Sequence, residues 1–158
     1  MAVRIRGIVP SDRDHIIRVT DETGAFLPDE LTVLGEIMDE YFNDPEGCGY
    51  HFLIAELEHD FAGYLCYGPT PMTHGAWDMY WCAVSPRLQG QGIGGTLFTM
   101  AADHIKNLGG RLILIDTSSN PNYAAARSLY ITLGYKHVST IPDFYNPGDH
   151  KETFWKAL

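Results

Sequence analysis

The sequence predicts one α/β domain over residues 1–158, built on a mixed sheet with central parallel strands and flanked by helices. Its length and its 45% hydrophobic residues suit the core of a single ordinary globular domain. Over residues 76–116, an apolar run, a glycine-rich loop, an amphipathic helix and a second apolar run follow one another. This order is typical of two parallel strands joined by a right-handed crossover helix. No internal repeat or interdomain linker is visible.

The first part of the chain predicts one strand followed by two helices. Residues 3–9 alternate apolar and polar side chains like a strand, and Ser11 followed by Asp14 resembles a capping box at the start of a helix. Pro28 occupies a favoured first helical position, and apolar residues then recur at helical spacing as far as Asn43.

The later part predicts most of the sheet. The expected strands are 50–57 and 61–67, paired as a hairpin, then 76–84, 111–116, 135–141 and 151–158. A helix is expected at 122–133, and another follows the glycine-rich loop. The predicted buried stripe of that second helix consists of Ile93, Leu97, Met100, Ala101, His104, Ile105 and Leu108.

The charge of the chain limits its partners. Eleven Lys and Arg against 20 Asp and Glu give a net charge of -9, which repels nucleic-acid backbones and anionic membranes. We therefore expect no nucleic-acid or membrane partner, and we expect a positively charged small molecule to be accepted more easily. The sequence leaves a homodimer open.

Cysteine, histidine and apolar patterns predict the compartment and the absence of a metal. The three cysteines have no paired spacing, which favours reduced thiols over a disulfide framework. No His-x-x-x-His or Cys-x-x-Cys pair occurs, so no metal site is expected. No apolar run approaches the roughly 18 residues of a membrane span, and the start lacks the apolar core of a signal peptide. We expect a cytoplasmic protein.

The glycine-rich loop is the first candidate for chemistry. Gln89-Gly90-Gln91-Gly92-Ile93-Gly94 lies between a strand and a helix, where backbone N–H groups and the positive helix end can bind a phosphate. A P-loop is a poor match because Gly94-Gly95-Thr96 lacks the lysine, and a dinucleotide loop would follow the first strand. The pattern alone equally describes a tight strand-to-helix turn.

Two motifs in order resemble a known family. Residues 84–94 (VSPRLQGQGIG) resemble the Gln/Arg-x-x-Gly-x-Gly/Ala acyl-CoA loop of the GNAT superfamily of N-acyltransferases. Residues 128–135 resemble its downstream Leu-Tyr…Gly-Phe element, with Tyr135 in place of Phe. The specific match covers about residues 77–135, and the flanking elements agree. The resemblance implies an N-acetyltransferase that moves an acetyl group from acetyl-CoA directly to a primary amine.

The resemblance also assigns residues to the acyl donor. It implies that the backbone of Ala83 and Val84 pairs with the pantetheine arm, and that the pyrophosphate is held by the N–H groups of Gln89, Gly90, Gln91, Gly92, Ile93 and Gly94. An Asn commonly lies seven residues before the family's Tyr, but Tyr123 occupies that position here. Asn122 is the adjacent candidate and Asn120 lies two residues before it, so the Asn that contacts the CoA arm stays open.

The resemblance implies that Tyr130 is the general acid for the leaving thiolate. A phenol of pKa near 10 can protonate a thiolate of conjugate pKa about 8.5 only when it is well positioned. The alternative is a core aromatic at helical spacing with Ala126 and Leu133.

Asp78 matches the position of the acidic residue that several family members carry on the strand before the loop, and we expect it to be the base. Burial among aromatic residues raises the pKa of a carboxyl and makes it a stronger base. An acid satisfied by backbone N–H groups or an arginine is an equal alternative. Strand alternation places Tyr80 and Cys82 on the same face as Asp78. We expect Tyr80 to take part in a proton relay and Cys82 to be a structural thiol.

Phe26, Tyr80 and Tyr145 are the predicted acceptor-binding residues. Tyr80 shares the face of Asp78, and the resemblance implies that the closing hairpin with Tyr145 and the loop with Phe26 border the acceptor. An ordinary hairpin tip explains Tyr145 equally well. The predicted acceptor is a small-molecule amine, an amino acid or a peptide amino terminus. The rival functional hypothesis is a non-catalytic acyl-CoA-binding sensor or regulatory module, which needs the loop but neither Tyr130 nor a base.

Overall fold

The structure is a computed structural model that describes residues 2–158. The chain forms two compact units, which are described separately. Unit 1 contains the described residues up to Gly68 together with Trp81–Ala101, and unit 2 contains Pro69–Tyr80 and Ala102–Leu158. The fourth strand and the third helix each contribute to both units.

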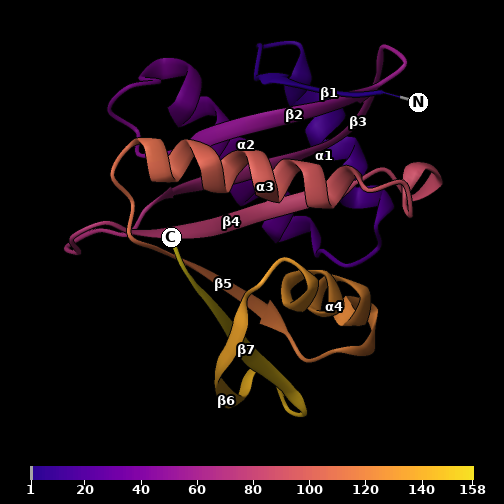
Figure 1. Cartoon of the computed structure of the whole chain (residues 1–158). Coiled ribbons are helices and arrows are strands. Elements are labelled where there is room, and N and C mark those ends of the chain that lie inside the picture. Colours follow the sequence, from indigo (N-terminus) through magenta and orange to yellow (C-terminus); the bar gives the residue numbers. More distant parts are fainter. Residues whose placement is uncertain (1) are drawn as a thin grey trace. The chain divides into compact units, whose positions relative to one another are not determined.

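The secondary structure agrees with the predicted α/β class (Figure 1). The strands are β1 Val3–Gly7, β2 His51–Leu57, β3 Asp60–Pro69, β4 Ala76–Val84, β5 Leu112–Ser118, β6 Lys136–Asn146 and β7 Asp149–Ala157. The helices are α1 Asp12–Glu22, α2 Pro28–Asn43, α3 Ile93–Asn107 and α4 Ala124–Thr132, with short 3₁₀ turns η1 Pro86–Leu88 and η2 Pro121–Tyr123. The strand order is β1-β2-β3-β4-β5-β7-β6, and β4 and β5 are the parallel pair near its centre. The predicted mixed sheet with central parallel strands is therefore confirmed.

Unit 1 is built around a core that α1 and α2 share with β2, β3 and the end of β4. Its buried members are Ile16, Val19, Leu34, Met38, Phe52, Ile54, Tyr64, Cys66 and Ala83. The Thr20 hydroxyl donates to the carbonyl of Ile16 at 2.7 Å, so the Tyr64 hydroxyl, also 2.7 Å away, donates to Thr20. This contact satisfies two buried hydroxyl groups between α1 and β3.

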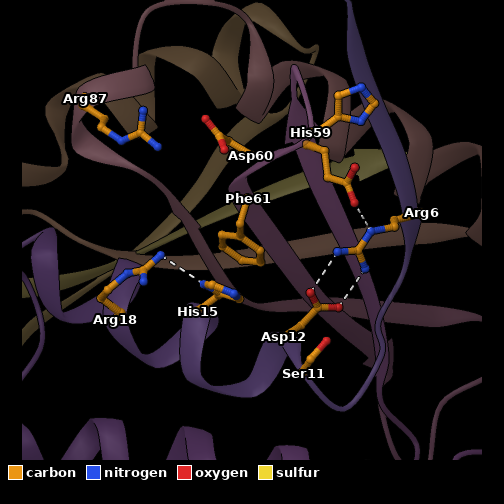
Figure 2. A pocket seen from close by; sticks show the side chains of 10 residues that line it. Arg6, Ser11, Asp12, His15, Arg18, His59, Asp60, Phe61 and Arg87 are labelled. Carbon is orange, nitrogen blue, oxygen red and sulfur yellow. Dashed lines mark hydrogen bonds and ion pairs between the residues drawn. The ribbon is translucent and has the colours of Figure 1, made fainter.

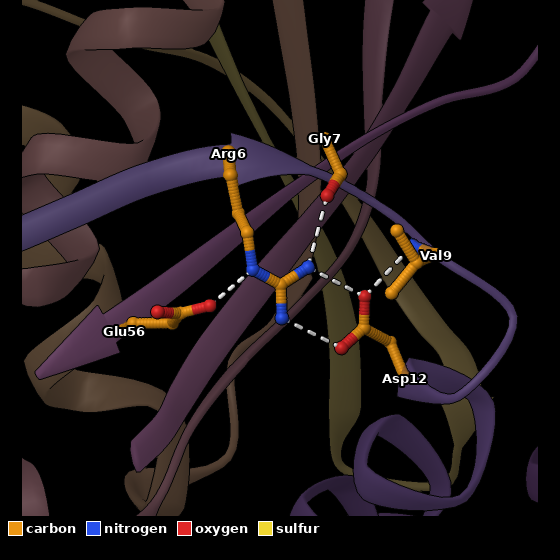
Figure 3. Close-up of polar contacts among 5 residues, drawn as sticks. All are labelled: Arg6, Gly7, Val9, Asp12 and Glu56. Carbon is orange, nitrogen blue, oxygen red and sulfur yellow. Dashed lines mark hydrogen bonds and ion pairs between the residues drawn. The ribbon is translucent and has the colours of Figure 1, made fainter. Parts of the chain in front are cut away.

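An ion-pair network fixes the start of α1 on the sheet (Figure 3). Arg6 on β1 donates from Nη1 and Nη2 to the two Asp12 carboxylate oxygens at 2.7 and 2.8 Å, and its Nε donates to Glu56 on β2. The Val9 N–H also donates to Asp12, at 2.8 Å. The predicted capping box is wrong, because Ser11 has a helical conformation and makes no side-chain cap. Asp12 takes over the anchoring of the helix start instead.

Unit 2 contains the β5-β7-β6 sheet and α4 (Figure 1). Its buried side chains include Trp77, Met79, Ile105, Ile113, Ile115, Tyr130, Tyr135 and Phe154. The β6–β7 hairpin is longer than predicted, since β6 continues to Asn146 and β7 begins at Asp149. All eleven residues of β6 are exposed, so no buried side chain marked its outer half in the sequence.

The predicted stripe of α3 needs a correction. Ile93, Leu97, Ala101 and Ile105 are buried, but Met100 and Leu108 are 45% and 55% exposed. Phe98, which the stripe left out, is buried. The buried face of α3 is therefore centred on Leu97 and Ala101. Met100 lies at the edge of this face, and Leu108 lies beyond the end of the helix at Asn107.

We expect Arg6→Met to lower the free energy of unfolding by about 3–5 kcal/mol, because it leaves the buried Asp12 carboxylate without its ion-pair partner. Arg13→Met is the matched control. The Arg13–Asp39 pair has side chains that are 39% and 63% exposed, so its loss should cost no more than about 1 kcal/mol. Urea unfolding of both variants measures the difference, and equal losses would contradict the anchoring role.

The same network predicts a pH dependence. Burial works to raise the pKa of Asp12, but the hydrogen bonds from Arg6 and the Val9 N–H prevail and hold it below the ordinary value of 3.8. A lowered folded-state pKa contributes stability above the unfolded value, and this stability is lost as the pH falls through the folded value. The difference in unfolding free energy between the parent and Asp12→Asn should therefore shrink when urea unfolding is repeated well below pH 3.8. A difference independent of pH would contradict the assignment.

Candidate functional site

The glycine-rich loop in unit 1 leaves its backbone open. Gly90 and Gly92 have φ angles of 82° and 79°, in the region that favours glycine, and a Cβ at either position would meet no atom within 4 Å. The N–H of Thr96 donates to the carbonyl of Gly92 at 3.0 Å, which is the first helical bond of α3. The N–H groups of residues 93–95 therefore precede the first intrahelical bond. With no acidic residue in the first turn, this helix start is suited to an anion.

The end of β4 leads directly into this loop. Ala83 is buried, and a Cβ on Gly63 of β3 would lie only 2.7 Å from the Ala83 carbonyl oxygen, so Gly63 permits the close approach of the two strands. The side chain of Gln89 donates to the Val84 carbonyl at 3.3 Å. Earlier on the same strand, the Trp81 ring lies 5.5 Å from the ring of Phe26 in the α1–α2 loop. Phe26 therefore does contact β4.

In unit 2, strand register assigns the candidate residues to faces of the sheet. Asp78 is paired with Leu114 and Met79 with Ile115, and Ile115 is paired with Phe154 on β7. The Tyr130 ring packs against Phe154 at 5.6 Å. Because neighbours in register share a face, Tyr130 lies on the face of Met79, opposite that of Asp78. The predicted acid and the predicted base therefore occupy opposite faces.

Asp78 is the third residue of β4 and is half-buried. Its carboxylate accepts a hydrogen bond of 2.6 Å from the Thr70 hydroxyl. Burial raises the pKa of Asp78 above its ordinary value, the Thr70 bond opposes this shift, and the negative charge of Asp116 adds to it. Tyr80, two residues along the strand, is 38% exposed. A carboxyl in this setting is a stronger base than one in water.

Tyr130 is 8% exposed and is surrounded by rings. Its ring meets Tyr135 at 6.3 Å in addition to Phe154, both with an edge-to-face geometry. These contacts hold the phenol in one orientation, as both an acid and a core aromatic require. The Tyr135 hydroxyl is a buried polar atom with no hydrogen-bond partner among residues 2–158. Sequence reasoning treated Tyr135 only as a substitute for Phe and missed it.

The two Asn candidates lie in the loop before α4. Asn120 accepts a hydrogen bond of 3.0 Å from the Asn122 N–H through its side chain, so it begins η2. Asn122 is exposed. Tyr145, the acceptor candidate on β6, is 42% exposed and meets Phe144 edge to face at 5.0 Å.

The remaining candidates for reactive groups are the cysteine thiols and possible metal ligands. Burial raises the pKa of the Cys82 thiol to about 12, so this thiol is protonated and a poor nucleophile near pH 7. Cys48, Cys66 and Cys82 are all free. Over residues 2–158, no group of three or more His, Cys, Asp or Glu is arranged to hold a metal. Within the same residues, no helix has the length and apolarity to cross a membrane.

Unit 1 also contains a hollow of about 280 Å³ beside α1 (Figure 2). Its lining residues are Arg6, Ser11, Asp12, His15, Arg18, Glu56, His59, Asp60, Phe61 and Arg87. Three arginines face three acidic residues there, and Arg6 is already paired with Asp12 and Glu56. None of the predicted site residues lines this hollow.

The chain is similar in sequence and in structure to a known protein family. Residues 17–135 match the model of the Acetyltransferase (GNAT) family. A comparison with curated proteins found no match. A crystal structure of a protein assigned to the GNAT acetyltransferases, from Desulfovibrio desulfuricans, is 38% identical, covers 99% of both chains and superposes with a TM-score of 0.93.

More distant structures share the fold. The ribosomal-protein-S18-alanine N-acetyltransferase of Escherichia coli is 18% identical, with 99% of this chain and 94% of that chain covered and a TM-score of 0.78. YncA of Salmonella typhimurium, solved with acetyl-CoA, is 17% identical, with coverage of 100% and 95% and a TM-score of 0.75. The family match over most of the chain and the 38% identical structure together show that this chain belongs to the Acetyltransferase (GNAT) family.

Proposed function

We propose that this protein is an acetyl-CoA-dependent N-acetyltransferase, one domain over residues 1–158, that moves an acetyl group to a primary amine by direct attack. The observation that carries the proposal is the open backbone of Gly90 and Gly92 at the start of α3 in a chain of this family. Ala83, Val84 and the N–H groups of Gln89–Gly94 would bind the acyl donor, with Asn122 as a further contact.

The transfer requires that the acceptor amine lose one proton and that the leaving thiolate gain one. The neutral amine attacks the thioester carbonyl, a C–N bond forms, and the C–S bond breaks. We assign the proton lost by the amine to Asp78, and the proton gained by the thiolate to Tyr130. Both protons move at one thioester carbon, and Tyr130 and Asp78 lie on opposite faces of the sheet. We therefore propose that Asp78 acts through a bridging water. The protonated Cys82 thiol supports direct transfer over an acyl-cysteine route.

The acceptor in this proposal is a primary amine, and the residues proposed to bind it are Phe26 of unit 1 and Tyr80 and Tyr145 of unit 2. The net charge of -9 favours a cationic molecule. A lysine-like amine must give up roughly 4–5 kcal/mol to become neutral at pH 7, whereas an α-amine gives up about 1 kcal/mol. Because Asp78 is a single carboxylate, we favour an α-amine of an amino acid or a peptide, the acceptor class that the name of the Escherichia coli protein indicates for that enzyme.

A non-catalytic acyl-CoA sensor is the second candidate. The observation in its favour is that Tyr130 is 8% exposed and packs as a core ring would. Such a protein would bind CoA through the same loop and release no thiol. The three free cysteines support the cytoplasm as the compartment in either case.

We expect Gly92→Val to weaken acetyl-CoA binding by at least about a hundredfold, because a side chain there fills the space that the pyrophosphate needs and strains the backbone. Gly49→Val is the matched control, since Gly49 also has a positive φ of 80° with no atom within 4 Å of its Cβ position. Calorimetry on both variants separates lost binding from backbone strain. Parental affinity in Gly92→Val would contradict the pyrophosphate assignment.

Tyr130→Phe should lower kcat by about 10²–10⁴-fold while the affinity for CoA stays near that of the parent, because only the proton donor is removed. The assay follows thiol release with a panel of amines, amino acids and peptides. A variant that keeps the parental kcat at a pH where chemistry limits the rate would remove Tyr130 from the mechanism.

The rise of kcat/KM with pH should follow the titration of Asp78. Thr70→Val removes the hydrogen bond that stabilises the carboxylate and should move this rise to higher pH. Asp116→Asn removes a repelling charge and should move it to lower pH. A carbon NMR titration of the Asp78 carboxyl should give the same order of pKa values in the absence of catalysis. If the profile of kcat/KM against pH moves in neither variant, Asp78 is excluded as the base.

A further inference from the structure

The end of β5 and the turn of the β6–β7 hairpin are joined by hydrogen bonds within unit 2. The Ser118 hydroxyl donates to the Asp149 carboxylate and accepts from the Asn120 N–H at 2.9 Å. One residue later, the Ser119 N–H donates to the His150 carbonyl at 3.0 Å, and the Ser119 hydroxyl accepts from the His150 N–H at 2.9 Å. Ser118 is 8% exposed, so water competes poorly for its bonds.

Arg127 joins the same loop to α4. Its Nη1 donates to the carbonyl of Ser118 at 2.6 Å and to the carbonyl of Asn120 at 2.9 Å. Arg127 and Tyr130 are three residues apart on one helix and therefore lie on neighbouring positions of one face. The guanidinium thus fixes the face of α4 that carries Tyr130 against the end of β5.

The hairpin tip is organised through His150. The N–H of Asp143 donates to His150 Nδ1 at 2.9 Å, and the Asp143 carboxylate accepts from the Gly148 N–H at 2.7 Å. Asp143 has a φ of 55°, and β6 loses its regular register with β7 across this segment. The tip with Phe144 and Tyr145 is therefore shaped by hydrogen bonds to His150, which is in turn bonded to Ser119.

We propose that Ser118, Arg127 and Asp149 are positioning residues that couple the β6–β7 hairpin to α4, so that the shape of the acceptor hairpin and the placement of the Tyr130 hydroxyl depend on each other. The tip is bonded to His150, and His150 is bonded to Ser119. The neighbouring residues continue the connection, because Asp149 is bonded to Ser118 and the Ser118 carbonyl to Arg127, on the face of α4 that carries Tyr130. A reacting geometry tolerates only small displacements, so loosening any link costs rate. The catalytic consequence rests on the proposed function, whereas the coupling itself does not.

The kinetic test is a double-mutant cycle between Ser118 and Tyr130. Ser118→Ala should lower kcat about tenfold and change KM for acetyl-CoA by less than about twofold, and it should have almost no further effect in the Tyr130→Phe background. Ser118→Thr keeps the hydroxyl and should restore kcat to near the parental value. Thr132→Ala is the control, because it removes an exposed α4 hydroxyl that bonds only within the helix. Equal falls of kcat in both backgrounds would overturn the proposal.

Amide hydrogen exchange tests the coupling without catalysis. Ser118→Ala and the milder Asp149→Asn should both speed exchange in α4 and in the hairpin tip, while Thr132→Ala leaves the tip unchanged. Faster exchange in α4 alone or in the hairpin tip alone would overturn the coupling, whether or not Tyr130 is the general acid. A parental kcat in Tyr130→Phe would instead contradict the proposed acid, and the exchange result would still decide whether the two segments are joined.

Discussion

The parallel pairing of Ala76–Met79 with Leu112–Ile115 decides which face of the sheet each chemical group of unit 2 occupies. A slip of one residue would exchange the faces and place the Asp78 carboxylate among the buried side chains that surround Tyr130. The register is pinned at its beginning, where the Gly75 carbonyl accepts from the Arg111 and Leu112 N–H groups at 2.7 and 3.3 Å. The Arg111 side chain also donates to the His74 carbonyl at 2.6 Å.

This register gives the two sides of the unit different chemical characters. One face carries Asp78 and Asp116, whose repulsion and burial keep the Asp78 proton more tightly bound than in water. The other face is aromatic and encloses Tyr130 between Tyr135 and Phe154. In the proposed reaction both groups act on one thioester, so Asp78 would reach the amine through a bridging water. Hydrogen bonding at the end of β5 then extends the order from the strands to α4 and the hairpin.

The elements that the sequence predicted well are those with strong local signals. Ala76–Val84 was predicted with its observed bounds because a run that is apolar apart from Asp78 ends at Ser85-Pro86. The glycine loop and Tyr130 were singled out because each belongs to a motif, and their roles stay predictions. The predicted capping box was wrong because Ser11 has a helical conformation and makes no cap. The start of α1 is held instead by the pair between Asp12 and Arg6 of β1, a contact that no local pattern indicates. The links through Ser118, Arg127 and Asp149 were missed for the same reason, since their partners lie up to 31 residues apart. The burial of Phe98 and Met100 was predicted the wrong way round, because both lie beside the centre of the buried face of α3.

We propose that the glycine-rich loop binds acetyl-CoA for catalysis and not for sensing alone. This proposal is tested most directly by incubating the protein with acetyl-CoA and a mixture of α-amino and ε-amino peptides and identifying the products by mass spectrometry, with released CoA measured in parallel. We expect acetyl groups on α-amines in an amount equal to the CoA released, and a loss of both in Tyr130→Phe. Saturable binding of acetyl-CoA with no acetylated amine and no CoA release would contradict it.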